Sequence, residues 1–210
     1  MTHNLILEYS KKKTEIKKRL REFKSVWKQS DKRVFSELTF CICTPQSKAV
    51  YCDRAVSVLR KNGALFRGNL KQLKAGLSGV RFPNNKARYI LKSRKLFTAD
   101  GAIRIKNRID TGDIPRTRRW LVRNVTGIGF KEASHFLRNI GFGDDLAILD
   151  VHVLRNMVKC GIIKGIPKNI SEAGYLTLEE KLRRFSRKVN IPLGELDLLF
   201  WSNETGEIFK

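Results

Sequence analysis

The chain has 210 residues, and its 43 Lys and Arg against 20 Asp and Glu give a formal net charge of +23. Hydrophobic residues make up 41% of the sequence, which excludes a disordered basic tail and provides for a buried core. A surface this basic favours a polyanionic partner, above all a nucleic acid, over an anionic membrane or an acidic protein.

The N-terminal segment does not resemble a secretory signal, because its charges follow the short apolar stretch 5–7 instead of preceding it. No apolar stretch approaches the roughly 18 residues that a membrane span needs. Three of the four cysteines lie between Cys41 and Cys52, and none forms a C-x-x-C pair that would indicate zinc or an iron–sulfur cluster. We therefore expect a cytoplasmic, DNA-associated protein with buried cysteines, no membrane contact, no metal and no cofactor.

Hydrophobic residues recur at helical spacing almost throughout the chain, and strand-like alternation is nearly absent. Pro45 is predicted to open a helix, and Thr177 with Glu180 fits a capping box at the start of another. Helices are predicted near 16–27, 33–43, 45–60, 70–77, 86–97, 116–124, 130–140, 151–158, 177–189 and 192–202. We expect one all-α domain over residues 1–210, with two helical lobes flanking a DNA-binding cleft.

The segment 118–141 is predicted to form a helix-hairpin-helix. Apolar residues follow helical spacing on both sides of the turn Gly127-Ile128-Gly129. Glycine permits positive φ and lets backbone N–H groups approach a phosphate, and the second helix adds its positive dipole end. An ordinary corner between two helices is the alternative. The net charge and the nearby arginines favour phosphate binding at Gly127 and Gly129.

Two ionisable residues near this hairpin have two interpretations each. Lys131 lies in the first turn of the second helix, where the helix dipole disfavours a cation. A neutral lysine amine is a nucleophile, whereas a charged lysine would contact phosphate. Sequence position alone does not distinguish these two interpretations. Asp150 precedes an apolar helical pattern, so it is predicted to cap that helix or to stabilise a developing cation.

The hairpin, Lys131 and an aspartate 19 residues later (150 − 131 = 19) together resemble the helix-hairpin-helix DNA glycosylase superfamily over roughly residues 30–205. The stretch LTFCICTPQS at 38–47 is similar to a glutamine-containing motif of that superfamily. No cysteine follows Cys160, unlike in the iron–sulfur branch, and no strand-rich N-terminal domain is present. The chain, including its ending from Trp201 to Lys210, is most similar to the archaeal-type (type 2) 8-oxoguanine DNA glycosylase/lyases.

This resemblance implies a function and a set of roles. Lys131 would attack C1′ of the damaged nucleotide and form a Schiff base, which permits β-elimination at the abasic site. Asp150 would stabilise the cationic transition state and help to deprotonate the lysine. Gln46 would fill the gap left by the flipped base. Phe82 and Trp201 would stack on that base, and Lys210 would distinguish 8-oxoguanine from guanine.

The expected partner is double-stranded DNA that contains 8-oxoguanine, bound by a monomer. Two alternatives remain at the level of the sequence. One is a related glycosylase/lyase for another oxidised base. The other is a non-enzymatic helix-hairpin-helix protein in which Lys131 only contacts phosphate. His135 and His152 are predicted to be helix-surface or capping residues rather than catalysts.

Overall fold

The computed structural model describes residues 2–210 and contains eleven α-helices within them. Its elements are α1 (Thr2–Trp27), α2 (Asp31–Cys43), α3 (Ala49–Lys61), α4 (Ala64–Arg67), α5 (Leu70–Gly76), α6 (Pro83–Phe97), β1 (Thr98–Ala99), β2 (Ala102–Ile103), the 3₁₀ helix η1 (Ile105–Arg108), α7 (Ile114–Asn124), α8 (Phe130–Asn139), α9 (Val151–Lys159), α10 (Glu172–Val189) and α11 (Leu193–Thr205). The two strands form one short antiparallel hairpin. The expected all-α class is confirmed.

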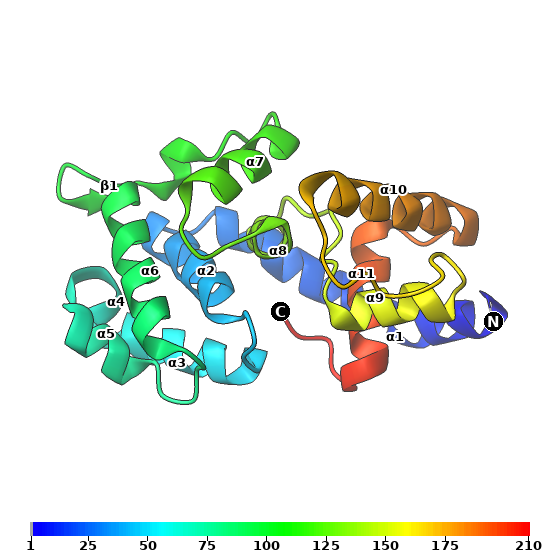
Figure 1. Cartoon of the computed structure of the whole chain (residues 1–210), viewed down its shortest axis with the longest axis horizontal. Coiled ribbons are helices and arrows are strands. Elements are labelled where there is room, and N and C mark those ends of the chain that lie inside the picture. The colour runs from blue at the N-terminus through cyan, green and yellow to red at the C-terminus, as the bar shows by residue number, and fades with distance from the viewer. Residues whose placement is uncertain (1) are drawn as a thin grey trace.

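Buried side chains form two hydrophobic clusters, which correspond to two lobes (Figure 1). The first cluster draws on residues 26–146 and joins α2 through α8. The second draws on residues 5–23 and 147–208 and joins α1 to α9, α10 and α11. The two ends of the chain therefore build one lobe together, while the middle of the chain builds the other.

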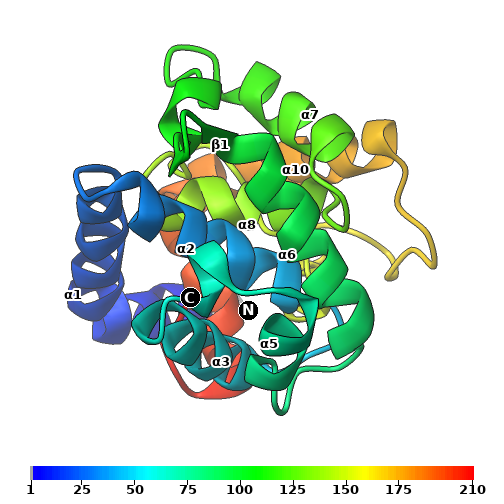
Figure 2. The same ribbon diagram turned by 90° about the vertical axis from the view of Figure 1, so that its left-hand side faces the viewer.

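Each lobe contains one helix that is buried on nearly every side, as expected for a helix inside a core. In α2, all ten residues from Val34 to Cys43 are buried, and Figure 2 shows this helix between α3, α6 and α8. In α11, all eight residues from Leu193 to Phe200 are buried. Of these two helices, α11 supplies a wall of the cavity described below, and α2 leads directly into the turn that supplies another.

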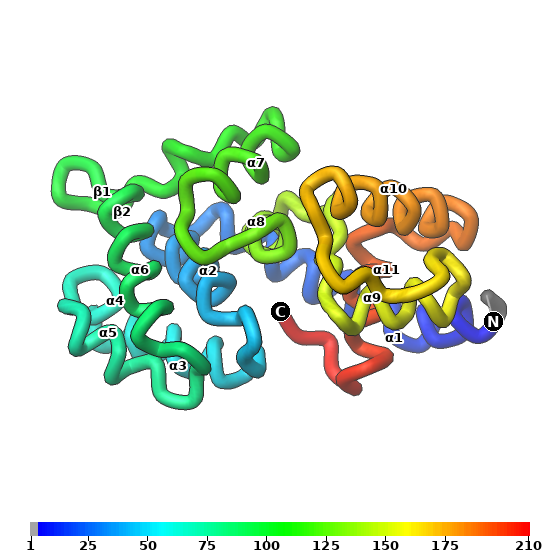
Figure 3. The backbone as a smooth tube through the Cα atoms, in the orientation of Figure 1, coloured from blue at the N-terminus to red at the C-terminus, as the bar shows by residue number. Residues whose placement is uncertain are grey.

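The end of the chain connects the lobes. After α11 the backbone turns back and Lys210 ends between the two lobes (Figure 3). Ile208 belongs to the second hydrophobic cluster, whereas Phe209 packs against the first. The last three residues are thereby held on both sides instead of fraying as chain ends usually do.

Two predicted helix starts are wrong. Pro45 does not begin a helix, because residues 44–47 form a turn and α3 starts at Ala49. The capping box at Thr177 is absent: α10 begins at Glu172, and the Ser171 side chain accepts a hydrogen bond from the Gly174 N–H. Thr177 lies inside the helix, where its hydroxyl donates to the carbonyl four residues earlier.

Within the described residues, none of the helices is long and apolar enough to cross a bilayer. The expected cytoplasmic location stays a prediction.

Candidate functional site

A cavity of about 870 Å³ lies where the two lobes meet. Its walls come from the turn at 44–50, from α8, from the start of α9, from α11 and from the chain end. Five of the six side chains that the sequence assigned to catalysis or base binding line this cavity: Gln46, Lys131, Asp150, Trp201 and Lys210. Residues separated by up to 164 positions in the sequence (210 − 46 = 164) thus meet at one site.

The predicted helix-hairpin-helix is formed by α7 and α8. Gly127 has a φ of +91°, and a Cβ at this position would lie 2.3 Å from the Tyr89 ring, so both conformation and space require glycine. Ile128 is buried and packs the turn against the first core cluster. In the part of the chain that the structure describes, the amides of Gly127 and Ile128 have no acceptor, which leaves them free for an anion.

Glu132 ties the turn to the first residues of α8. One of its carboxylate oxygens accepts a hydrogen bond from the Gly129 N–H at 3.0 Å. Its other oxygen lies 2.9 Å from the ammonium of Lys131, whose side chain is 29% exposed. The Gly129 amide, which the sequence assigned to phosphate, is therefore already engaged in this structure. The Lys131 ammonium is likewise engaged in this structure, in its ion pair with Glu132.

The extended segment that leads to Asp150 is held by buried side chains at three successive amides. The Ala147 N–H donates to Glu179 at 2.9 Å, and the Ile148 N–H donates to Asp197 at 2.8 Å. The Leu149 N–H donates to the Tyr175 hydroxyl at 3.2 Å, and this hydroxyl donates to the Ala147 carbonyl at 2.6 Å. Because each of these amides donates a hydrogen bond, the segment cannot shift without leaving buried polar groups unpaired. The segment therefore fixes the position of Asp150.

Asp150 itself is the N-cap of α9. Its Oδ1 accepts a hydrogen bond from the Val153 N–H at 2.8 Å. The capping interpretation of this residue is therefore confirmed. Capping does not exclude an electrostatic role, because Asp150 is only half-buried and also lines the cavity. The cap holds the carboxylate in one orientation at the cavity wall.

A second charged pair lies beneath the site, and the sequence did not indicate it. Arg138 donates to Asp197 at 2.9 Å, and both side chains are almost fully buried. Burial raises the pKa of Asp197 to about 6, and the neighbouring guanidinium opposes that rise. The spacing 131, 135, 138 along α8 is a helical i, i+4, i+7 pattern that puts all three residues on the cavity side. This pattern could have drawn attention to Arg138.

The two histidines belong to the cavity wall rather than to the helix surface. The prediction for His135 is wrong: it is buried, with its ring edge-on to Phe40 at a centroid distance of 5.4 Å. Burial, followed by the positive charges of Arg138, Lys131 and Lys210, holds the pKa of His135 well below its usual value. Its imidazole is therefore neutral beside the lysine. His152 packs edge-on against Trp201 at a centroid distance of 6.5 Å.

The C-terminal Lys210 reaches the cavity, but its ammonium pairs with carboxylates beside the cavity. Its ammonium lies 3.1 Å from Glu37 and 2.5 Å from Asp53, and 5.0 Å from the centre of the Phe40 ring. Glu37 is buried in α2, so this contact anchors the chain end to the first lobe. The part of Lys210 that remains available to a ligand is its backbone rather than its ammonium.

Phe82 does not join the other residues. It is the N-cap of α6, its side chain is 51% exposed, and it does not line the cavity. The guanidinium of Arg81 stacks on its ring at 5.4 Å. An exposed aromatic ring next to an arginine suits contact with DNA outside the cavity.

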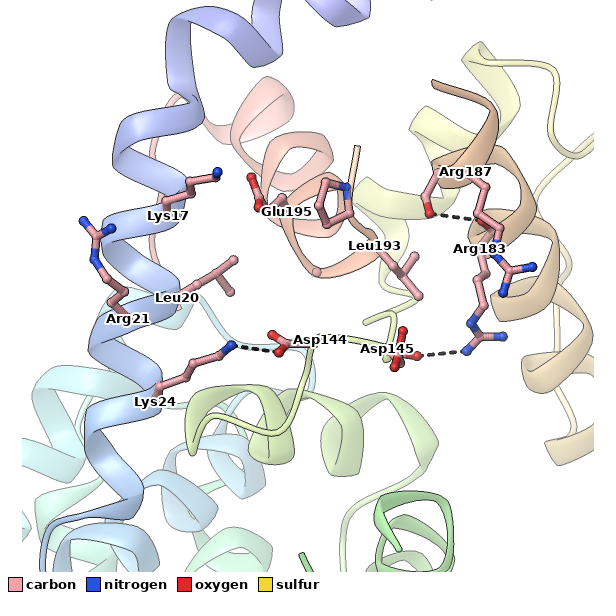
Figure 4. A pocket seen from close by; sticks show the side chains of 13 residues that line it. Lys17, Leu20, Arg21, Lys24, Asp144, Asp145, Arg183, Arg187, Leu193 and Glu195 are labelled. Atoms are coloured by element: carbon pink, nitrogen blue, oxygen red, sulfur yellow. Dashed lines mark hydrogen bonds and ion pairs between the residues drawn. The ribbon is translucent and has the colours of Figure 1, made fainter. Parts of the chain in front are cut away.

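A separate cavity of about 560 Å³ lies between α1, α10 and the start of α11 (Figure 4). Its walls carry five cationic side chains: Lys17, Arg21, Lys24, Arg183 and Arg187. Lys24 pairs with Asp144 at 2.7 Å, and Arg183 donates to the Asp145 carbonyl at 2.8 Å. This cavity shares no residue with the first and contains none of the residues expected for catalysis. Over residues 2–210, neither cavity nor any other place groups three or more His, Cys, Asp or Glu side chains that could hold a metal ion.

Known proteins match this chain over nearly its whole length. A relative from Fusobacterium nucleatum, named 8-oxoguanine DNA glycosylase/AP lyase, is 43% identical over 204 residues, which is 96% of this chain and 94% of that protein. A relative of the same name from Korarchaeum cryptofilum is 40% identical over 207 residues, covering 97% of this chain and 94% of that protein.

Two solved structures superpose closely. The 8-oxoguanine DNA glycosylase of Thermotoga maritima matches with a TM-score of 0.88 at 36% identity, covering all of this chain and 98% of that one. The Methanocaldococcus jannaschii 8-oxoguanine glycosylase/lyase, solved with a 15mer DNA containing 8-oxoguanine, matches with a TM-score of 0.87 at 36% identity, covering 98% and 99% of the two chains. The family model described as 8-oxoguanine DNA glycosylase matches residues 16–191. The chain belongs to the family of 8-oxoguanine DNA glycosylases.

Proposed function

We propose that this chain removes 8-oxoguanine from double-stranded DNA and then nicks the resulting abasic site. The observation that carries the proposal is that Lys131 and Asp150, from separate elements, line one cavity between the lobes. Residues from both lobes of one chain line that cavity, so the proposed reaction needs no side chain from a second copy, and we infer one glycosylase domain over residues 1–210 that acts as a monomer.

The chemistry needs Lys131 as a neutral amine. Its Nζ attacks C1′ of the flipped nucleotide, the N-glycosidic bond breaks, and the base departs with the bonding electrons. Asp150 stabilises the positive charge that develops on the sugar and accepts a proton from the lysine. The C1′–O4′ bond of the sugar ring then breaks as O4′ takes up a proton, which leaves an imine between C1′ and Nζ. This imine acidifies C2′, so loss of a proton from C2′ expels the 3′-phosphate and nicks the strand.

The remaining cavity residues suit recognition of the flipped base. Gln46, on the turn at the cavity rim, fills the space that the base leaves in the duplex. Trp201 offers an aromatic face within the cavity. The backbone of Lys210 offers an acceptor to N7–H, which 8-oxoguanine has and guanine lacks. Exposed Phe82 contacts the duplex beside the lesion rather than the flipped base.

The hairpin turn holds the DNA backbone. The free amides at Gly127 and Ile128, next to the N-terminus of α8, form an anion-binding concavity. Gly129 joins this contact only if an incoming phosphate displaces the Glu132 carboxylate from its amide.

Borohydride trapping tests the proposal. Duplex DNA with one 8-oxoguanine is incubated with the protein, and the mixture is reduced. Wild type should give a covalent complex, because reduction fixes the imine to Lys131. Lys131→Gln should give none and should bind the same duplex nearly as well as wild type. Arg123→Gln, on the last turn of α7, serves as a matched control that keeps the nucleophile and should still be trapped.

Each outcome separates the candidate functions. Trapping on duplex with an oxidised pyrimidine but not with 8-oxoguanine would indicate a glycosylase for another lesion. The absence of any adduct, on either lesion or on abasic DNA, would leave a DNA-binding protein without lyase activity. Undiminished trapping by Lys131→Gln would place the nucleophile elsewhere.

A further inference from the structure

A buried lysine that the proposed reaction does not use connects two loops beside the cavity. Lys86, in the first turns of α6, is 4% exposed. Its ammonium donates to the carbonyls of Cys43 and Pro45 at 2.6 and 2.8 Å, and to the Ser47 hydroxyl at 2.9 Å. The first acceptor is the last residue of α2 and the other two lie in the turn that follows it, so one ammonium group fixes the turn that carries Gln46 to the end of α2.

The same contact extends to a second loop. The Ser47 hydroxyl also accepts a hydrogen bond from the Arg81 N–H at 3.0 Å. Arg81 directly precedes Phe82, whose carbonyl accepts from the N–H of Lys86 at 3.1 Å. Lys86 and Ser47 thus form a hub that joins the turn at 43–47 to the loop at 81–82.

Each of these loops carries a residue in the left-handed backbone region. Gln46 has a φ of +56° and Phe82 a φ of +57°. The other two non-glycine residues with positive φ in the described chain are Asp100 and Asn190, residue types that adopt it readily. For Gln and Phe this backbone conformation is strained and persists only where the surroundings enforce it. The hub is the surrounding structure that both residues share.

We propose that Lys86 is a positioning residue that holds Gln46 and Phe82 in their strained conformations, ready to enter the DNA as the damaged base leaves. This inference rests on the proposed function, since it assigns the two side chains to the duplex. If Gln46 and Phe82 already have their DNA-bound conformations, the protein loses less conformational entropy on binding than if it had to order both loops on the DNA.

Removing the hub should leave a folded protein. Burial lowers the pKa of Lys86, because a charged ammonium loses its hydration inside the protein. An apolar side chain of similar length avoids this desolvation free energy. In Lys86→Met, the Cys43 carbonyl keeps its second donor, the Cys52 thiol at 3.1 Å. The turn loses its hold on Gln46 while α2, α3 and α6 keep their apolar contacts.

The test combines Lys86→Met with Gln46→Ala in a double-mutant cycle. The single-turnover rate of 8-oxoguanine excision from duplex DNA should fall on the order of 10- to 100-fold in Lys86→Met. The double variant should be no slower than the slower single variant, because loss of Lys86 already removes what a correctly placed Gln46 contributes. Losses that multiply, or a wild-type rate in Lys86→Met, would overturn the inference.

Two further measurements keep the result interpretable. Emission of 2-aminopurine next to the lesion reports base extrusion without chemistry, and the rise on binding should be smaller in Lys86→Met than in wild type. This readout tests Lys86 even if wild type excises another base, so the two proposals fail separately. Val56→Ala, a core truncation in α3, lowers stability without touching the hub and should leave emission unchanged. If Lys86→Met does not fold, Ser47→Ala removes the link to Arg81 and should show the same deficit.

Discussion

At the scale of single residues, Asp150 caps a helix and is proposed to stabilise the cationic sugar, and substitution can separate these two tasks. Its carboxylate caps α9 through the Val153 amide and faces the cavity that contains Lys131. The cap needs only a short side chain with an oxygen acceptor, whereas stabilisation of a cationic sugar needs the negative charge. Cap and charge are therefore distinct physical requirements at one position.

We predict that Asp150→Asn keeps the stability of the protein and loses its chemistry. Asparagine caps as well as aspartate, so the free energy of unfolding in urea should stay near that of wild type. Single-turnover excision should fall on the order of 10²- to 10³-fold, the range seen when a preorganised electrostatic group is removed. Asp150→Ala should show the same loss of rate and, in addition, about 1 kcal/mol of lost stability. A wild-type excision rate in Asp150→Asn would reduce Asp150 to a cap.

Residues of this kind could be predicted from the sequence, because their signals are local. A Gly-rich turn before Lys131 and an apolar helical pattern after Asp150 are visible within a few positions. The buried partners of the site could not be predicted in the same way. Arg138 pairs with a residue 59 positions away, and nothing in either local pattern names the other. The exposed position of Phe82 outside the cavity could not be predicted either, because an aromatic residue before a proline gives no indication of which side of the loop it occupies.

At the scale of elements, the hairpin between α7 and α8 depends on one glycine more than on the other. Gly127 combines a positive φ with a ring carbon of Tyr89 at 2.3 Å from the place of a Cβ. Gly129 has a φ of −110°, which any residue adopts, and a Cβ there would lie 3.4 Å from the Glu132 carboxylate. The sequence motif gives no difference between the two glycines. Only their backbone conformations show that Gly127 needs to be glycine and Gly129 does not.

Gly127→Ala should therefore destabilise the protein by at least about 1–2 kcal/mol, whereas Gly129→Ala should stay within about 0.5 kcal/mol of wild type. Urea unfolding measures both. The affinity for undamaged duplex should also fall in Gly127→Ala, because the turn must move to relieve the clash and its free amides move with it. Equal effects of the two substitutions would contradict a distinction based on backbone conformation.

Helix existence followed from hydrophobic spacing, but helix starts depended on competing local chemistry. Thr177 matched a capping pattern and yet lies within α10, since its hydroxyl returns to the carbonyl of Ala173. Pro45 matched the first turn of a helix, yet Lys86 from a distant element holds that segment as a turn. In both places the local structure was decided by a contact, and the spacing of residues along the chain does not reveal that contact.

At the scale of the whole molecule, two lobes arise because the chain ends meet. The segment α1 packs with α9 to α11, so the cavity lies between a lobe built from the middle of the chain and one built from its ends. Buried ion pairs bridge elements across this arrangement, such as Arg118 with Glu179 at 2.7 and 2.9 Å. The helical pattern of the sequence led to the expectation of two lobes, whereas the composition predicted only that a core exists.

The net charge of +23 leads to a prediction about DNA affinity that distinguishes regions of the surface. Binding to undamaged duplex should weaken on the order of a thousandfold or more between about 50 and 200 mM salt, because phosphate contacts release condensed counterions. Only cations that contact phosphate contribute to this dependence. Arg123 is exposed in the last turn of α7, beside the hairpin turn, and has no carboxylate partner among the described residues. Lys188 is also exposed, in the last turn of α10. Figure 1 shows that α10 ends at the side of the second lobe that faces away from the first.

Arg123→Gln should lower the slope of log affinity against log salt by about 0.9, the value for one phosphate contact, while Lys188→Gln should leave it unchanged. Fluorescence anisotropy of a labelled duplex over a salt series measures both slopes. The reverse order, with Lys188 lowering the slope and Arg123 without effect, would move the DNA from the hairpin face to the outer end of the second lobe. Equal slopes in all three proteins would mean that neither cation touches phosphate, and the charge would then act only as a diffuse field that raises the rate of encounter.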